Sequence, residues 1–167
     1  GGREPRTIVL GGDSAGGCLA ALACQRLRDA GEALPAALCL VSPATDLTGS
    51  GESMRTKATS DPMIDRAWLD QAAQLWLGDA DPASAAVSPL FGDCTGLPPT
   101  LIQVGTEEML LSDSERFAAR LHATGVAVTL ERWHGLWHDF QMLAALLPAA
   151  REAIAGAGGF MRRWLDR

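Results

Sequence analysis

A serine between two glycine pairs, directly after a strand-like run, constrains this chain more than any other feature. Residues 7–10 are strand-prone, and a G-x-S-x-G pattern at residues 12–16 follows them before a helical stretch begins. A serine on such a sharp strand-to-helix turn, the nucleophile elbow, has its hydroxyl held out over the edge of a sheet. The residues two before and two after it come so close that we expect only glycine to fit. The pattern predicts that Ser14 is a nucleophile; the alternative is a turn whose serine merely caps the helix.

The residue after the serine is predicted to act through its backbone. The turn places the N–H of Ala15 at the start of the next helix, where the helix dipole leaves partial positive charge. Such a donor stabilises an oxyanion, so we expect the Ala15 N–H to supply one.

The composition indicates one soluble, globular domain. The chain has 167 residues, of which 47% are hydrophobic and 20% charged, enough for a core of its own. A net charge of −6 without a basic cluster argues against nucleic acid as a partner. No run approaches the roughly 20 apolar residues of a membrane-spanning helix, and we expect no leader before the first strand.

The cysteines favour a reducing compartment. Cys18, Cys24, Cys39 and Cys94 show no C-x-x-C spacing, and three of them lie among apolar residues. We expect buried, reduced thiols in a cytoplasmic protein, with neither a disulfide nor a metal site.

Apolar runs alternate with helical patterns along most of the chain. The strands and the helices between them are predicted at residues 7–10, 16–30, 36–41, 100–105, 112–124 and 126–133. The first strand suits burial on both faces, and the last alternates as strands do near a sheet edge. These elements predict an α/β fold with a parallel sheet of about four strands and flanking helices. Chemistry in such sheets lies at the carboxyl ends of the strands.

The stretch between the second and third strands is longer than a connection requires. Residues 44–99 are broken by turns around one helical pattern at 67–77, and we expect residues 48–82 to form a cap or substrate-pocket excursion. Trp68 and Trp76 fit a pocket or the core equally well. The candidates for substrate binding are Met63, Trp68, Leu136 and Trp137.

A serine nucleophile needs a base, and the base needs a carboxylate. Of the three histidines, His122 lies inside a predicted helix and His134 lies close to the fourth strand. His138 stands at the start of the final helical region, from which a side chain can reach back over the sheet. We therefore predict His138 as the base.

The acid is expected near the turn after the third strand, where Glu107, Glu108 and Asp113 compete. A capping-box pattern at residues 112–115 would keep Asp113 at a helix N-terminus. The spacing alone does not decide between the two glutamates. The order serine, acid, histidine is that of the α/β-hydrolase arrangement.

The motifs resemble those of one family over nearly the whole length. The chain is similar to the C-terminal part of the hormone-sensitive-lipase-like esterases (bacterial family IV) of the α/β-hydrolase superfamily. The resemblance implies that Ser14 is the nucleophile, Glu108 the acid, where aspartate is more usual, and His138 the base. It also implies hydrolysis of short-chain carboxylic esters without a metal or organic cofactor. The motifs lie at residues 11–17, 42–47, 61–63, 88–90, 96–99, 103–111, 137–140 and 146–153.

The chain departs from the family pattern upstream of the serine. The family takes oxyanion donors from a His-Gly-Gly loop, whereas the only His-Gly of this sequence, His134-Gly135, lies downstream. We expect the chain alone to be weakly active or inactive, and its first strand to expose an edge that could pair with another chain or a second copy. The alternative function is a receptor-like relative that binds a small ligand without catalysis, although all three triad positions are filled.

Overall fold

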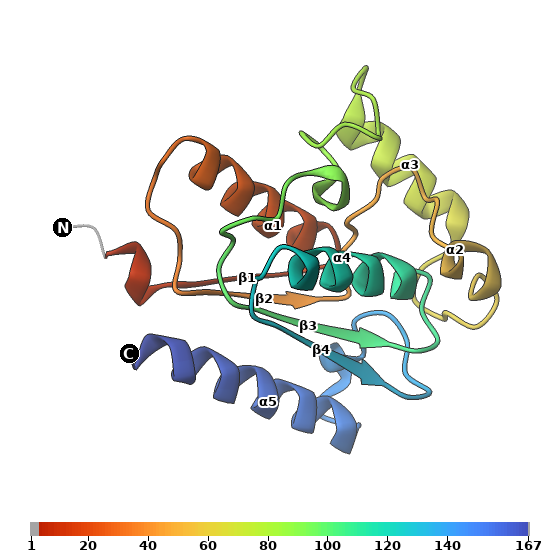
Figure 1. Cartoon of the computed structure of the whole chain (residues 1–167). Helices are drawn as coiled ribbons and strands as arrows, with labels where there is room; N and C mark the ends of the chain where they lie inside the picture. The colour runs from red at the N-terminus through yellow and green to blue at the C-terminus, as the bar shows by residue number, and fades with distance from the viewer. Residues whose placement is uncertain (1–3, 167) are drawn as a thin grey trace.

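The computed structural model describes residues 4–166, and its centre is a parallel sheet with helices on both faces (Figure 1). The strand order is β1 (Val9–Asp13), β2 (Ala37–Val41), β3 (Thr100–Gly105) and β4 (Val128–Trp133). The helices α1 (Ser14–Asp29) and α4 (Leu111–Ala123) cover one face, and α5 (Pro148–Leu165) covers the other. The predicted α/β fold with a parallel sheet of about four strands is confirmed.

The two central strands carry the core. Leu38, Leu40 and Ile102 belong to the cluster that β2 and β3 form with α1 and α4. Cys39 and Leu101, on the opposite face, pack with α5. A parallel strand covered on both faces needs apolar residues at successive positions, which is why the sequence pattern identified these strands.

The first strand starts later and is less buried than predicted. A short 3-10 turn (Pro5–Thr7) precedes β1, which begins at Val9 and continues through the glycines. Gly11 and Asp13 are exposed, and β1 pairs only with β2 within residues 4–166. The prediction of burial on both faces is only partly confirmed: Val9 and Leu10 pack against the clusters on opposite faces but are half-buried, and β1 lies at an edge of this sheet. Pairing of that edge with another chain stays a prediction.

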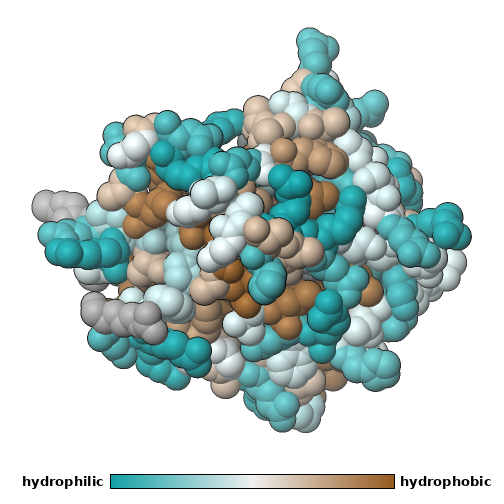
Figure 2. Space-filling model, viewed as in Figure 1, coloured by the Kyte–Doolittle hydropathy of each residue, from teal (hydrophilic) through white to brown (hydrophobic). Residues whose placement is uncertain are grey.

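The stretch between β2 and β3 contains two helices, α2 (Ser53–Thr56) and α3 (Arg66–Leu77), and a 3-10 turn (Pro89–Phe91). Asp65 caps α3 by accepting the N–H of Trp68 at 2.8 Å. No residue of α3 is buried, and Figure 2 shows hydrophobic residues exposed among polar ones on the side of the molecule where α3 lies. Across residues 4–166, no helix is long and apolar enough to cross a membrane.

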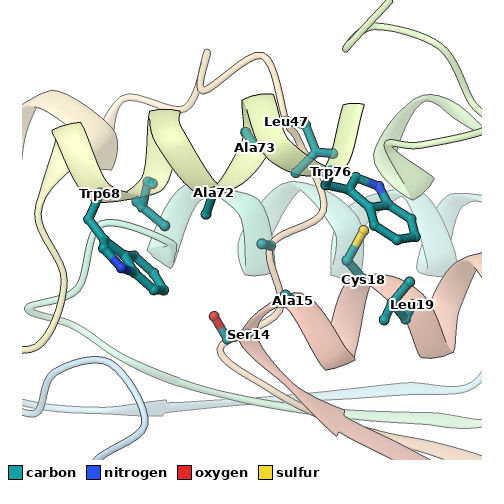
Figure 3. Close-up of a pocket in the computed structure, with 11 residues that line it drawn as sticks. Ser14, Ala15, Cys18, Leu19, Leu47, Trp68, Ala72, Ala73 and Trp76 are labelled. Atoms are coloured by element: carbon teal, nitrogen blue, oxygen red, sulfur yellow. The ribbon is translucent and has the colours of Figure 1, made fainter. Parts of the chain in front are cut away.

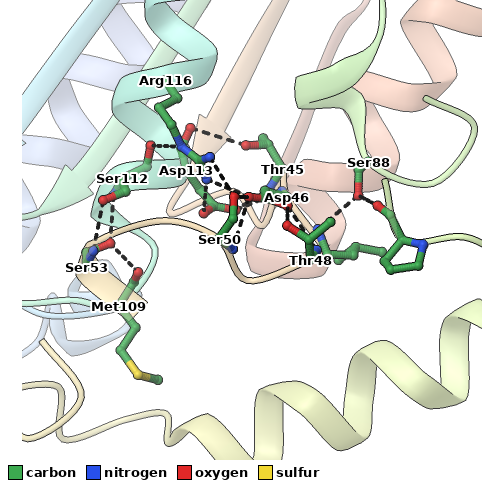
Figure 4. Close-up of polar contacts among 12 residues, drawn as sticks. Thr45, Asp46, Thr48, Ser50, Ser53, Ser88, Met109, Ser112, Asp113 and Arg116 are labelled. Atoms are coloured by element: carbon green, nitrogen blue, oxygen red, sulfur yellow. Dashed lines mark hydrogen bonds and ion pairs between the residues drawn. The ribbon is translucent and has the colours of Figure 1, made fainter. Parts of the chain in front are cut away.

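Buried polar side chains attach the loop after β2 to α4 (Figure 4). Oδ2 of Asp113 accepts two backbone N–H groups of that loop at 2.9 Å each, and Arg116 pairs with Asp46 at 2.7 Å. Burial raises the pKa of Asp113 to about 7. The predicted capping box is wrong: α4 has no side-chain cap, and Oγ of Ser112 accepts the N–H of Ser53 instead. The side chains of Ser112 and Asp113 accept hydrogen bonds from backbone groups that are distant in sequence. A local sequence pattern gives no information about such tertiary contacts.

Candidate active site

The turn between β1 and α1 has the strained geometry expected of a nucleophile elbow. Ser14 has a left-handed backbone conformation with φ of 50°. A Cβ on Gly12 would overlap the carbonyl group of Gly16, so glycine is required at the first position. The expectation for the second position is wrong, because a Cβ on Gly16 would only reach Oδ1 of Asp13 at 3.7 Å, an ordinary contact. The backbone of Gly16 is what lies close to Gly12, and a Cβ at position 16 would meet no obstacle.

The fold brings Ser14 and His138 together from positions 124 residues apart. Oγ of Ser14 lies 3.0 Å from Nε2 of His138. His138 follows β4 and is buried, just before a 3-10 turn (Phe140–Leu143). The other two histidines, His122 and His134, are exposed and outside this site. The pair has the spacing at which an imidazole can take the proton of a hydroxyl.

A glycine at the end of β3 lets the histidine loop cross the sheet edge. A Cβ on Gly105 would overlap the carbonyl group of Leu136, two residues before His138. The backbone N–H of Glu107 donates to that carbonyl at 2.9 Å, and the N–H of Thr106 donates to the carbonyl of Trp133 at 3.0 Å. The turn after β3 and the loop after β4 are thereby joined.

Of the three candidate acids, Glu108 lies beside the histidine. Its Oε1 is 3.6 Å from Nδ1 of His138, longer than a hydrogen bond, and its Oε2 accepts from the hydroxyl of Ser42 at 2.9 Å and the N–H of Gly105 at 2.8 Å. Burial raises the pKa of Glu108 above its ordinary value. Glu107 instead pairs with Lys57 at 2.9 Å, and Asp113 lies in the cluster of Figure 4.

Two polar residues of the site were missed by the sequence analysis. Ser42, which has φ of 44°, holds Glu108, and Oδ2 of Asp139 lies 3.2 Å from Nε2 of His138. Burial lowers the pKa of His138, but the carboxylates of Asp139 and Glu108 outweigh it and raise that pKa to about 10. The available signals were position, since Ser42 directly follows β2 and Asp139 follows the predicted base, and the family motifs at 42–47 and 137–140 that contain them.

An apolar cavity of about 140 Å³ opens beside Ser14 between α1 and α3 (Figure 3). Trp68 and Trp76 lie at its two ends, with Ala72 between them on α3 and Cys18 and Leu19 on α1 beneath Trp76. Both tryptophans are 54% exposed, so the structure places them at the cavity and not in the core. The full lining is Ser14, Ala15, Cys18, Leu19, Ala44, Leu47, Trp68, Leu69, Ala72, Ala73 and Trp76.

A second hollow, here called the polar cleft, opens on the histidine side of Ser14. Met63 and Trp68 line it, as the sequence predicted for a pocket. Leu136 and Trp137 line neither hollow: they are half-buried against Phe140 and the inner face of α5. The structure does not place them at either hollow, because the loop after β4 points its apolar side chains at α5, and their contact with substrate stays a prediction. The polar cleft is lined by Asp13, Ser14, Ala15, Gly16, Met63, Ile64, Trp68, His138 and Asp139.

The start of α1 supplies backbone donors at the serine. Ala15 is the second residue of α1, and the first N–H groups of a helix have no acceptor within it. Ala15 lines both hollows beside Ser14. All four cysteines are free and buried, and within residues 4–166 no group of three His, Cys, Asp or Glu side chains could hold a metal ion.

The comparisons with known proteins agree with this fold. A family model described as the alpha/beta hydrolase fold matches residues 2–142. An acetyl-hydrolase of Streptomyces hygroscopicus is 42% identical over 161 residues, which are 96% of this chain and 54% of that protein. A solved esterase from the bacterial hormone-sensitive lipase (HSL) family superposes with a TM-score of 0.95 at 43% identity, over 98% of this chain and 55% of the other.

Another solved structure, EstE5 soaked by p-nitrophenyl butyrate, superposes with a TM-score of 0.94 at 36% identity and covers 98% of this chain and 55% of its own. The chain thus spans about half the length of the relatives it matches. With the fold, the elbow and the family model in agreement, the resemblance indicated by the sequence motifs is confirmed, and the chain belongs to the α/β-hydrolase fold family.

Proposed function

We propose that the chain is the part of a carboxylic-ester hydrolase that carries a Ser14-His138-Glu108 triad. The observation that carries the proposal is the 3.0 Å contact between Oγ of Ser14 and Nε2 of His138. It joins a strained nucleophile elbow to a buried histidine at the carboxyl ends of β1 and β4. No structural role requires a hydroxyl in that conformation to face an imidazole.

The reaction proceeds through an acyl-enzyme. His138 accepts the proton of Ser14 as the hydroxyl oxygen attacks the ester carbonyl, and the Ala15 N–H stabilises the oxyanion. The tetrahedral intermediate then releases the alcohol, which takes its proton from His138. Water, deprotonated by His138, attacks the acyl-enzyme and frees the acid and Ser14. Glu108 stabilises the imidazolium that forms in each half-reaction.

The substrates are esters with short acyl chains. The apolar cavity beside Ser14 has a volume of about 140 Å³. Trp76 lies at the opposite end of this cavity from Trp68. Similar proteins support this class, one being named an acetyl-hydrolase and another having been soaked with p-nitrophenyl butyrate. The four buried, free thiols support a reducing compartment, so we place the protein in the cytoplasm.

The chain alone should hydrolyse slowly. Ala15 provides a single predicted oxyanion donor, and each lost donor costs on the order of 10²–10³ in kcat. The relatives are about twice as long, so we propose that a longer protein reaches the full rate.

A second candidate is binding of a small apolar ligand without turnover. It is favoured by the 3.6 Å separation between Glu108 and His138, which is longer than a hydrogen bond.

Hydrolysis of p-nitrophenyl acetate and butyrate by the chain and its Ser14→Ala and His138→Ala variants tests the proposal. Both variants should lose hydrolysis, whereas His134→Ala, which alters an exposed histidine of the same loop, should retain it. Hydrolysis that survives in Ser14→Ala would reject the proposal. Saturable ligand binding by a chain that never turns over would favour the second candidate.

A further inference from the structure

Two groups compete for the same nitrogen of His138. Oγ of Ser14 lies 3.0 Å from Nε2, and Oδ2 of Asp139 lies 3.2 Å from it. The Asp139 side chain is only 10% exposed, and its Oδ1 has no hydrogen-bond partner among the described residues. The hydrolytic mechanism above gives this carboxylate no part.

The two contacts require opposite states of Nε2. To accept the proton of Ser14, Nε2 must present a lone pair, which would then face a carboxylate oxygen of Asp139. A hydrogen on Nε2 turns that repulsion into an electrostatic attraction to Asp139, but the ring can no longer deprotonate Ser14. The Asp139 contact therefore stabilises the form of His138 that cannot act as a base.

The backbone fixes this contact. Asp139 has a left-handed conformation, with φ of 50° and ψ of 33°, and its carboxylate returns to the ring of the preceding residue. Its N–H lies 3.5 Å from Oγ of Ser42, the residue that also holds Glu108. Asparagine and glycine tolerate this conformation, so they can replace Asp139 with little backbone cost.

The charged groups around the ring come from three segments. Glu108 approaches Nδ1 from the turn after β3, Asp139 approaches Nε2 from the loop after β4, and Asp13 lines the polar cleft at the end of β1. All three are carboxylates. Burial opposes the imidazolium, but Asp139 and then Glu108 outweigh it, which raises the pKa of His138 to about 10.

We propose that Asp139 is a positioning residue that holds Nε2 of His138 protonated in the free protein and thereby restrains the activation of Ser14. The inference deepens the proposed function and rests on the assignment of Ser14 and His138 there. Hydrolysis then requires that the imidazolium loses its proton or that the Asp139 contact opens. The acid limb of the pH–rate profile should accordingly lie at a higher pH than an unrestrained histidine would give.

The test is the ¹⁵N NMR titration of the histidine rings in the whole chain. Its three histidines give few signals, and the exposed His122 and His134 serve as internal references. The variants are Asp139→Asn and Asp139→Gly, with Asp13→Asn as the matched control. That control removes a carboxylate from the same cleft without removing one of the ion-pair contacts to the ring.

We expect the titration midpoint of His138 to fall by about one pH unit or more in both Asp139 variants. It should move by much less in Asp13→Asn. At a pH between the midpoints of the parent chain and the variant, the Nε2 signal should change from that of a protonated nitrogen to that of an unprotonated one. An unchanged midpoint in either folded Asp139 variant, or an equal fall in Asp13→Asn, would overturn the proposal.

Hydrolysis of p-nitrophenyl acetate by the same samples tests the proposed esterase function separately from the role of Asp139. The acid limb of kcat should move to lower pH together with the NMR midpoint, while KM changes little. A midpoint that moves in a chain that neither hydrolyses the ester nor is labelled on Ser14 by a fluorophosphonate would refute the proposed nucleophile and leave the contact of Asp139 with the ring standing. If the midpoint does not move in a chain that hydrolyses the ester, the esterase proposal stands and the proposed role of Asp139 is refuted.

Discussion

The hydroxyl of Ser42 donates a 2.9 Å hydrogen bond to Oε2 of Glu108, beneath the ring of His138. Both side chains are fully buried, and Ser42 directly follows β2 with φ of 44°. The same oxygen of Glu108 accepts the N–H of Gly105 at 2.8 Å. The carboxylate is therefore held from two strands, which leaves Oε1 facing the histidine.

Removal of the Ser42 hydroxyl should impair the support that Glu108 gives to His138 and leave the position of Ser14 unchanged. In Ser42→Ala and Ser42→Gly, the buried carboxylate loses a donor, so its protonated form is favoured and its support of the imidazolium falls. We expect kcat for p-nitrophenyl acetate to fall by about 10- to 100-fold in both, from a hydrogen bond of about 1.5–3 kcal/mol. Glycine relieves the strain at this φ, so full activity in Ser42→Gly would contradict the role of the hydroxyl.

Gly105 should tolerate no side chain. A Cβ there would overlap the carbonyl group of Leu136, so Gly105→Ala must displace the loop that carries His138. We expect a loss of unfolding free energy on the order of 3 kcal/mol, measured in urea. Gly159→Ala is the control: it lies inside α5 with nothing near its Cβ, and alanine there should stabilise by about 0.5–1 kcal/mol. Equal stabilities of the two variants would contradict the close approach.

Trp76 should limit the length of the acyl chain. It lies at the end of the apolar cavity over Cys18 and Leu19, so Trp76→Ala lengthens the space that begins at Ser14. The rate ratio of p-nitrophenyl octanoate to butyrate should rise by about 10-fold or more. Leu75→Ala alters an 82% exposed residue of the same helix outside the cavity and should leave the ratio unchanged. A ratio that moves equally in both variants would place the acyl chain elsewhere.

His138 should make the stability of the fold depend on pH. Burial opposes its charge, but Asp139 and Glu108 raise its pKa from 6.5 to about 10, so the folded state binds the proton more tightly than the unfolded state. The stabilisation is fully present below about pH 6.5 and is lost as the pH rises through about 10. Urea unfolding across this window should show a decline in the chain that is absent in His138→Gln. Parallel curves for the two proteins would contradict the raised pKa.

The strands and the side chains that meet at the candidate site could be predicted because each leaves a local signal. Apolar runs mark β2 and β3, and the glycine pattern marks the turn at Ser14. The histidine and acid were predicted from their places after the strands and from the family motifs, and the structure brings Ser14 and Glu108 to 3.0 and 3.6 Å from the ring of His138.

The contacts that depend on how distant segments pack together could not be predicted from the sequence. Asp139 reaches the ring only through a left-handed backbone, and the hydroxyl of Ser112 binds a distant N–H instead of capping its own helix. Leu136 and Trp137 are apolar residues beside the site, and only the position of α5 shows that they turn away from it. Local pattern does not encode the direction of a side chain in a loop.

Covalent labelling by a fluorophosphonate probe tests the central claim most directly, because the probe reacts with an activated serine whether or not turnover is fast. Mass spectrometry after labelling of the chain should find the adduct on Ser14. The adduct should be absent from Ser14→Ala, strongly slowed in His138→Ala and unchanged in His134→Ala. A chain that stays unlabelled, or one labelled on another serine at the same rate in His138→Ala, would contradict the pairing of Ser14 with His138 as nucleophile and base.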